Sequence, residues 1–175
     1  DRVFWLLTMI MAFLSAAMSV VYIDNKMRSD IAWIMDFSLI TYVLLAPVLT
    51  SVFTALFVGS DYSGGTLRNK IIAGHRRVHI YLTNLIVCSF SGIVFSIAFV
   101  TPHILFGLFF GGQIQAGMKT LMLYGGLSLA LIIAFTALFT LIAMLCQNKS
   151  HTVAGCILLV FVLLFIGVYI TSALN

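Results

Sequence analysis

Glutamate is absent from this 175-residue chain, and charged residues of any kind make up only 8% of it, against 62% hydrophobic residues. A typical soluble domain is about a quarter charged, so a soluble globular protein is excluded. Intrinsic disorder is excluded as well, because disordered chains combine low hydrophobicity with high charge. Nine Lys and Arg residues on so apolar a chain also exclude a nucleic-acid-binding protein. What remains is an integral membrane protein.

Cysteine is scarce too, with three residues that all lie inside apolar runs: Cys88, Cys146 and Cys156. None has the C-x-x-C spacing of a metal site, and their placement does not suggest a disulfide framework. His75, His79 and His151 have no carboxylate or Cys partner at ligand spacing. We therefore expect no metal and no cofactor.

Five long uncharged runs dominate what is present. A bilayer core about 30 Å thick requires roughly 20 apolar helical residues. Runs of about this length cover residues 3–23, 37–58, 80–100, 120–146 and 152–170. The sequence therefore predicts an all-α polytopic helical bundle, with residues 1–175 forming a single transmembrane domain.

The segment 101–119 is apolar but too short to form another span. Thr101-Pro102 are expected to end the third span, because proline lacks a backbone N–H. Residues 104–110, followed by Gly111-Gly112, predict a short interfacial or re-entrant helix.

Basic residues predict the orientation, since Lys and Arg near span ends accumulate on the cytoplasmic side. With five spans, one side carries six of them and the other carries three, namely Lys26, Arg28 and Lys119. The side with six includes the N-terminus and the loop 59–79, which are therefore expected to be cytoplasmic. The last residue then falls outside, which predicts a further span beyond it.

The loop 59–79 has the pattern of a short capped helix. Thr66 is expected to be the N-cap after two glycines, the helix to cover 66–73, and Gly74 to end it in a left-handed conformation. Leu67 and Ile71 share one face, with Ile72 beside them. Because a helix of two turns is unstable alone in water, it must be held by contacts with the spans or with a partner.

A simpler interpretation of this loop is a solvated basic turn. Arg76 and Arg77 would then only contact lipid headgroups. That interpretation explains the charges. It does not explain the glycine pair or the apolar residues Leu67, Ile71 and Ile72 in the same loop. The pattern alone leaves both interpretations open.

The run Phe57-Val58-Gly59-Ser60-Asp61-Tyr62-Ser63-Gly64-Gly65-Thr66-Leu67-Arg68-Asn69-Lys70 resembles the segment between the second and third spans of ABC-2 type permeases. These are the membrane subunits of bacterial ATP-binding-cassette exporters. In that family an acidic residue precedes Gly-Thr-Leu/Ile, and a short coupling helix follows. An Arg near the start of the next span then comes before a Tyr or a similar residue. The detailed resemblance covers residues 57–84, where Tyr81 takes the place of the tyrosine. The family has six spans, of which this chain supplies five.

The resemblance implies a subunit of the bacterial cytoplasmic membrane that has three kinds of partner: a cytoplasmic ABC ATPase, a second copy or paralogue of the permease, and membrane lipids. The residues implied in ATPase coupling are Asp61, Gly65, Thr66, Leu67, Arg68, Lys70, Ile71, Arg76 and Arg77. The basic rim of the helix would pair with carboxylates of the ATPase. The chain has no Walker lysine motif, so ATP hydrolysis would belong to the partner and no catalytic residue is expected.

Few other residues suggest chemistry. Asp36 is interpreted as an interfacial residue with headgroup or loop contacts in preference to a role in binding a substrate cation, and His103 as a residue at the outer end of the third span with a helix-end role in preference to proton transfer. Without a chain of buried carboxylates, a proton- or sodium-driven transporter is disfavoured. Polar residues within the spans, such as Ser15, Ser19 and Asn84, could line a path, although such residues more often mediate helix packing.

Two other classes of function remain. A non-transporting immunity or assembly protein could bind a cytoplasmic partner through the same loop 59–79. A membrane-embedded enzyme lacks a nucleophile with a base and an orienting group beside it. The sequence does not identify the substrate or its binding residues.

Overall fold

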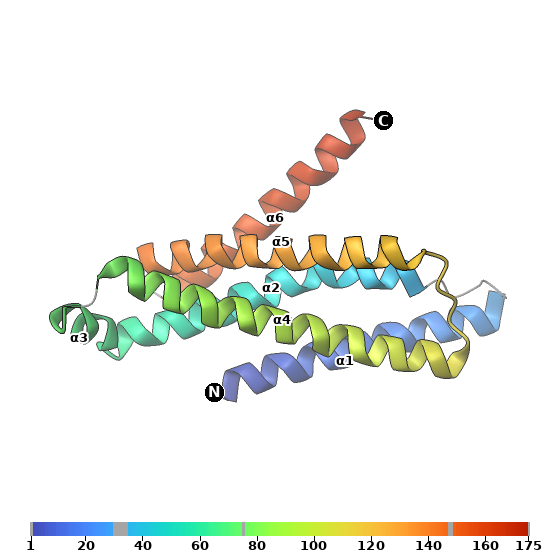
Figure 1. The fold of residues 1–175 in the computed structure, drawn as a ribbon, viewed down its shortest axis with the longest axis horizontal. Coiled ribbons are helices and arrows are strands. Elements are labelled where there is room, and N and C mark those ends of the chain that lie inside the picture. Colours follow the sequence, from blue (N-terminus) through green and yellow to red (C-terminus); the bar gives the residue numbers. More distant parts are fainter. Residues whose placement is uncertain (1, 30–34, 75, 147–148, 175) are drawn as a thin grey trace. The chain divides into compact units, whose positions relative to one another are not determined.

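Six helices make up the computed structural model, which describes residues 2–29, 35–74, 76–146 and 149–174. Figure 1 colours them in chain order from blue to red. In that order they are α1 Arg2–Ser29, α2 Met35–Ser63, α3 Thr66–Ile72, α4 Arg77–Phe110, α5 Met118–Leu145 and α6 Lys149–Leu174.

Five of these helices, all except α3, are long and apolar enough to cross a bilayer. This confirms the predicted all-α membrane bundle and its five candidate spans. The helices extend beyond the apolar runs because backbone hydrogen bonding continues into the polar ends. In α1, for example, Lys26 and Arg28 occupy the last turn, where positive charge is favourable next to the helix C-terminus.

The predicted end of the third span at Pro102 is wrong. Helix α4 is continuous over 34 residues from Arg77 to Phe110, with Pro102 inside it, so residues 104–110 are its last turns and not a separate interfacial or re-entrant helix. A proline removes one backbone hydrogen bond, and packing against a neighbouring helix can compensate for that loss. At about 1.5 Å per residue, α4 is roughly 50 Å long and exceeds the bilayer core.

The chain forms two compact units, each built from two segments. The first unit comprises Asp1–Ala46 and Phe90–Ala134, and the second comprises Pro47–Ser89 and Phe135–Asn175. Helices α2, α4 and α5 each contribute residues to both.

In the first unit, α1 packs along the second half of α4 through a stripe of buried residues spaced four apart: Leu7, Met11, Ser15 and Ser19. The Ser15 hydroxyl donates to the carbonyl of Phe99, and Ser19 Oγ lies 2.9 Å from His103 Nδ1. His103 is therefore a buried residue inside α4, not a residue at its end. Because the contacted positions advance together along both helices, α1 and this part of α4 run in the same direction.

The α1–α4 contact also ends in a specific interaction. Lys26 Nζ donates to the carbonyl oxygens of Phe110 and Gly111, at 2.9 and 2.8 Å. These carbonyls lie at the C-terminus of α4, where no intrahelical donor is available. A cation from α1 therefore caps α4.

In the second unit, α6 packs against α5 around a buried cluster of Phe139, Cys156 and Val160. Partly buried apolar side chains surround that cluster, among them Val48 from α2. A hydrogen bond of 3.1 Å between Ser89 and Thr136 joins α4 to α5. This unit also contains α3 and the loop for which the sequence predicts a partner.

Candidate functional site

Helix α3 lies between the end of α2 and the start of α4. It is bounded by two glycines with positive backbone φ, Gly65 at 69° and Gly74 at 86°. Glycine suits such positions because it carries no Cβ. The predicted helix is confirmed, and so is the left-handed Gly74 that ends it; Ala73 is the C-cap residue instead of the last helical one.

The predicted N-cap is wrong. Gly65 occupies the cap position, and no side chain caps the helix there. The Thr66 hydroxyl instead points back and donates to Asp61, at 2.9 Å from its carbonyl oxygen and 3.0 Å from its Oδ1. The left-handed Gly65 places Thr66 one residue into the helix, so its hydroxyl faces α2.

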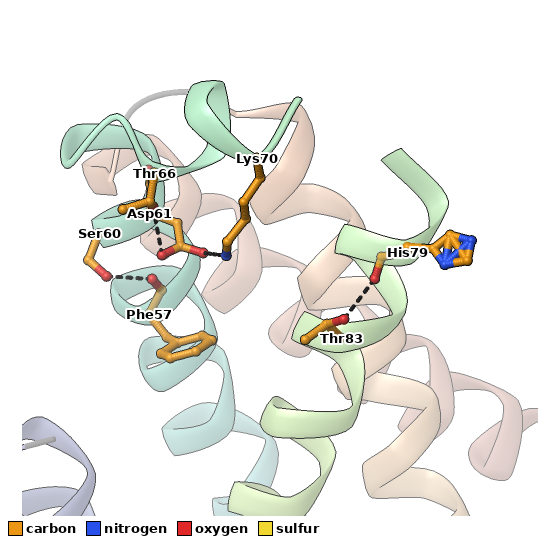
Figure 2. Close-up of polar contacts among 7 residues, drawn as sticks. All are labelled: Phe57, Ser60, Asp61, Thr66, Lys70, His79 and Thr83. Atoms are coloured by element: carbon orange, nitrogen blue, oxygen red, sulfur yellow. Dashed lines mark hydrogen bonds and ion pairs between the residues drawn. The ribbon is translucent and has the colours of Figure 1, made fainter. Parts of the chain in front are cut away.

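Asp61 holds α3 at two points. Its Oδ1 accepts the hydroxyl of Thr66, and its Oδ2 lies 3.1 Å from Lys70 Nζ. The side chains of Asp61 and Lys70 in this ion pair are 21% and 42% exposed. Figure 2 shows both α3 residues converging on Asp61, while the imidazole ring of His79 points away from them. One carboxylate at the end of α2 thus fixes both turns of α3.

The other side of α3 presents apolar groups to its surroundings. Ile71 is 43% exposed and Ile72 is 74% exposed. Arg76 and Arg77, which follow on the chain, are exposed as well. Leu67 and Arg68 lie on the α3 backbone, but their side chains fall outside what the structure describes.

Lys70 is one of the basic residues that the resemblance places on the rim of the helix. In the structure it forms an ion pair with Asp61. The nine-residue separation between Asp61 and Lys70 spans a turn whose path the sequence does not specify. The exposed cations of this loop are therefore Arg76 and Arg77, among the residues whose side chains are described.

Two tyrosines beside the loop anchor their helices to α5. Tyr62, next to Asp61 on α2, donates its hydroxyl hydrogen to the carbonyl of Met144, and Tyr81 on α4 donates to the carbonyl of Ala137 at 3.1 Å. Both tyrosines lie in the segment that carries the resemblance, which gave a place to Tyr81 but no separate role to Tyr62. The available signal was an amphipathic aromatic at the end of an apolar run, a position that tyrosine favours in membrane proteins.

Asp36 makes the loop contacts that the sequence predicted. Its Oδ2 accepts the backbone N–H groups of Gln115 and Ala116, at 3.0 and 2.8 Å. It lies in the first unit, whereas Asp61 lies in the second.

Comparison with known proteins gives no match: no protein-family model, no curated protein and no solved structure resembles this chain significantly. The loop between α2 and α4, together with the apolar helices around it, is therefore the feature that bears on function.

Proposed function

We propose that this chain is the permease subunit of an ABC-2 type exporter in a bacterial cytoplasmic membrane. Helix α3 is its coupling helix, on the cytoplasmic side, and docks in a groove of a separate ATPase subunit. A second copy or a paralogue of the permease completes the export pathway. Closure of the ATPase dimer on ATP moves α3, and α3 moves the spans.

The observation that carries this proposal is the two-sided character of α3. One side is tied to Asp61 at the end of α2, and the other side exposes Ile71 and Ile72. A seven-residue helix is too short to be stable alone. Its attachment to α2 allows it to transmit force, and its exposed isoleucines offer an apolar anchor for a partner's pocket.

The contacts beyond Asp61 support a transmission role. Tyr62 follows Asp61 directly and binds the backbone of α5, and Tyr81 binds α5 from α4. A displacement of α3 therefore reaches α2, α4 and α5 through hydrogen bonds within one compact unit. Rigid-body movement of packed helices is a common form of such switching.

Co-expression of this chain with a cytoplasmic ABC ATPase subunit, followed by co-purification, tests the docking step. Ile72→Asp places a charge on the exposed side of α3, and we expect it to reduce recovery of the ATPase at least about tenfold, as loss of a central apolar anchor does. Ile114→Asp is the matched control, because Ile114 is an exposed isoleucine in the loop between α4 and α5. Both variants should insert in the membrane at the wild-type level.

Recovery of the ATPase at the wild-type level with Ile72→Asp contradicts the assignment of α3 as the coupling helix. A second measurement separates an exporter from an immunity or assembly protein that uses the same loop. In an exporter, the permease alters the rate of ATP hydrolysis by the co-purified subunit. Binding without any such change favours the alternative.

A further inference from the structure

A half-enclosed cavity of about 390 Å³ lies in the first unit, between the first halves of α2 and α5. Its walls are almost entirely apolar and include Val43, Val100, Leu121 and Leu131. Pockets that hold small molecules typically measure about 300–1,000 Å³ and are mainly apolar, with a few placed polar groups. The cavity therefore has the size and lining of a small-molecule site.

The polar groups of the cavity differ in whether they already have partners. Tyr42 and Ser128 form a hydrogen bond with each other, and Ser128 also donates to the carbonyl of Gly125 at 2.8 Å. Asp36, by contrast, uses only one of its carboxylate oxygens. Oδ2 accepts the two backbone N–H groups described above, whereas Oδ1 is buried and has no hydrogen-bond partner among the residues that the structure describes.

Asp36 forms no ion pair with the residues that the structure describes. In the described part of the chain the two ion pairs are Arg28–Asp24 and Lys70–Asp61. Lys26, in the same unit as Asp36, is engaged with the carbonyls at the end of α4. The cavity thus combines an apolar wall with one carboxylate oxygen that lacks a donor.

We infer that this cavity binds a lipophilic amine, whose ammonium group donates to Asp36 Oδ1 while its hydrocarbon body fills the space between α2 and α5. A buried carboxylate oxygen is best satisfied by a cationic N–H donor, because a charge-assisted hydrogen bond is about twice as strong as a neutral one. An anionic amphiphile would place like charges together and is excluded from the site. Binding of the amine does not require an ATPase. If the chain is an exporter, the bound amine is its cargo, and this step rests on the proposed function.

Binding of tritiated 1-adamantylamine to the full chain in phosphatidylcholine nanodiscs tests this inference. This probe is a rigid hydrocarbon with one ammonium group, and adamantane-1-carboxylate is the anion with the same body. We expect saturable binding that excess unlabelled amine displaces and the carboxylate does not. Empty nanodiscs measure the amount of amine that partitions into lipid.

Asp36→Asn should weaken this binding at least about tenfold. The Asn side chain keeps an oxygen for the two backbone N–H groups but replaces the other oxygen with an NH2 group, which repels an ammonium. Asp24→Asn is the control, because it neutralises a carboxylate of the same unit that does not line the cavity. Thermal unfolding of both variants checks that the fold is retained.

A second pair of variants tests the cavity by shape. A Cβ added at Gly125 or at Gly126 meets no atom within 4 Å, but only Gly125 is a lining residue. Gly125→Leu should therefore abolish binding by filling the space, and Gly126→Leu should leave it unchanged. The inference is overturned if the wild type shows no saturable binding, if the carboxylate competes as well as the amine, or if binding survives both Asp36→Asn and Gly125→Leu. None of these outcomes depends on co-purification of an ATPase, so this inference and the proposed function can fail separately.

Discussion

Lys70 Nζ lies 3.1 Å from Oδ2 of Asp61 and joins α3 to the last turn of α2. The same carboxylate accepts the hydroxyl of Thr66 through its other oxygen. These two contacts replace the side-chain cap that the helix lacks at Gly65. A short helix that is tied to a long one in this way can move with it as one body, which is what the proposed coupling role of α3 requires.

Asp61→Asn should loosen α3 without unfolding the protein. The substitution removes the ion pair with Lys70, but its amide oxygen can still accept from Thr66. Because the pair is partly exposed, the loss in global stability should stay below about 1 kcal/mol. We expect faster amide hydrogen exchange across Thr66–Ile72. Asp24→Asn, which removes the exposed pair with Arg28, should leave exchange in α3 at the wild-type rate.

Ser15→Leu should destabilise the contact between α1 and α4. Ser15 is fully buried and bonds to the carbonyl of Phe99, so a larger side chain cannot fit without separating the helices. Overpacking of this kind costs about 1–3 kcal/mol. Ala17→Leu is the matched control, because Ala17 is an exposed small residue of the same helix. Detergent-induced unfolding followed by circular dichroism compares the two, and equal midpoints would argue against the contact.

Lys26→Gln should open the C-terminus of α4. The two carbonyls that Lys26 binds would lose a cationic donor at the negative end of a helix, at a cost of about 1 kcal/mol. Hydrogen exchange at the amide of Gly112, which bonds to the carbonyl of Gly107 at 2.7 Å, reports on this end. Arg28→Gln removes a cation from the same turn of α1 that pairs with Asp24, and it should have little effect. Unchanged exchange at Gly112 in Lys26→Gln would show that the cap is not formed.

Tyr81→Phe should weaken both the second unit and the coupling. The substitution deletes the hydroxyl that donates to the carbonyl of Ala137 and keeps the ring, so the expected loss is about 1 kcal/mol of unfolding free energy. If the proposed function is correct, the permease-dependent change in ATP hydrolysis should fall as well, while ATPase recovery stays constant. Tyr169→Phe removes the hydroxyl of an exposed tyrosine on α6 and should alter neither quantity.

Several features could be predicted from sequence because they depend only on local chemistry. Five uncharged runs are each long enough to span a bilayer; four lie within a helix, and the fifth, 120–146, ends one residue beyond α5. The turn at Gly74 was also predictable, since a left-handed residue after a short helix is almost always glycine. The role of α3 in docking an ATPase stays a prediction.

Other features were not predictable, because they depend on contacts between distant residues. Pro102 is a helix breaker by local rules, yet α4 continues through it beside α1, which contacts the neighbouring residue His103 through Ser19. Threonine is a residue type that commonly caps helices, yet the hydroxyl of Thr66 bonds to Asp61 because Gly65 takes the cap position. Asp36 was expected at the edge of a span, and its place on an apolar cavity depends on residues of α5 more than 80 positions away.

The sequence by itself determined that the chain is helical, apolar and suited to a bilayer, because the cost of burying charge and unpaired backbone groups in lipid leaves few alternatives. It also determined which loop carries the excess of basic residues. Only the tertiary structure decided how those residues are used: Lys70 pairs with Asp61, whereas Arg76, Arg77 and Ile72 remain exposed. The physical reason is that composition sets which residues can be buried, whereas hydrogen-bond partners are set by the path of the chain.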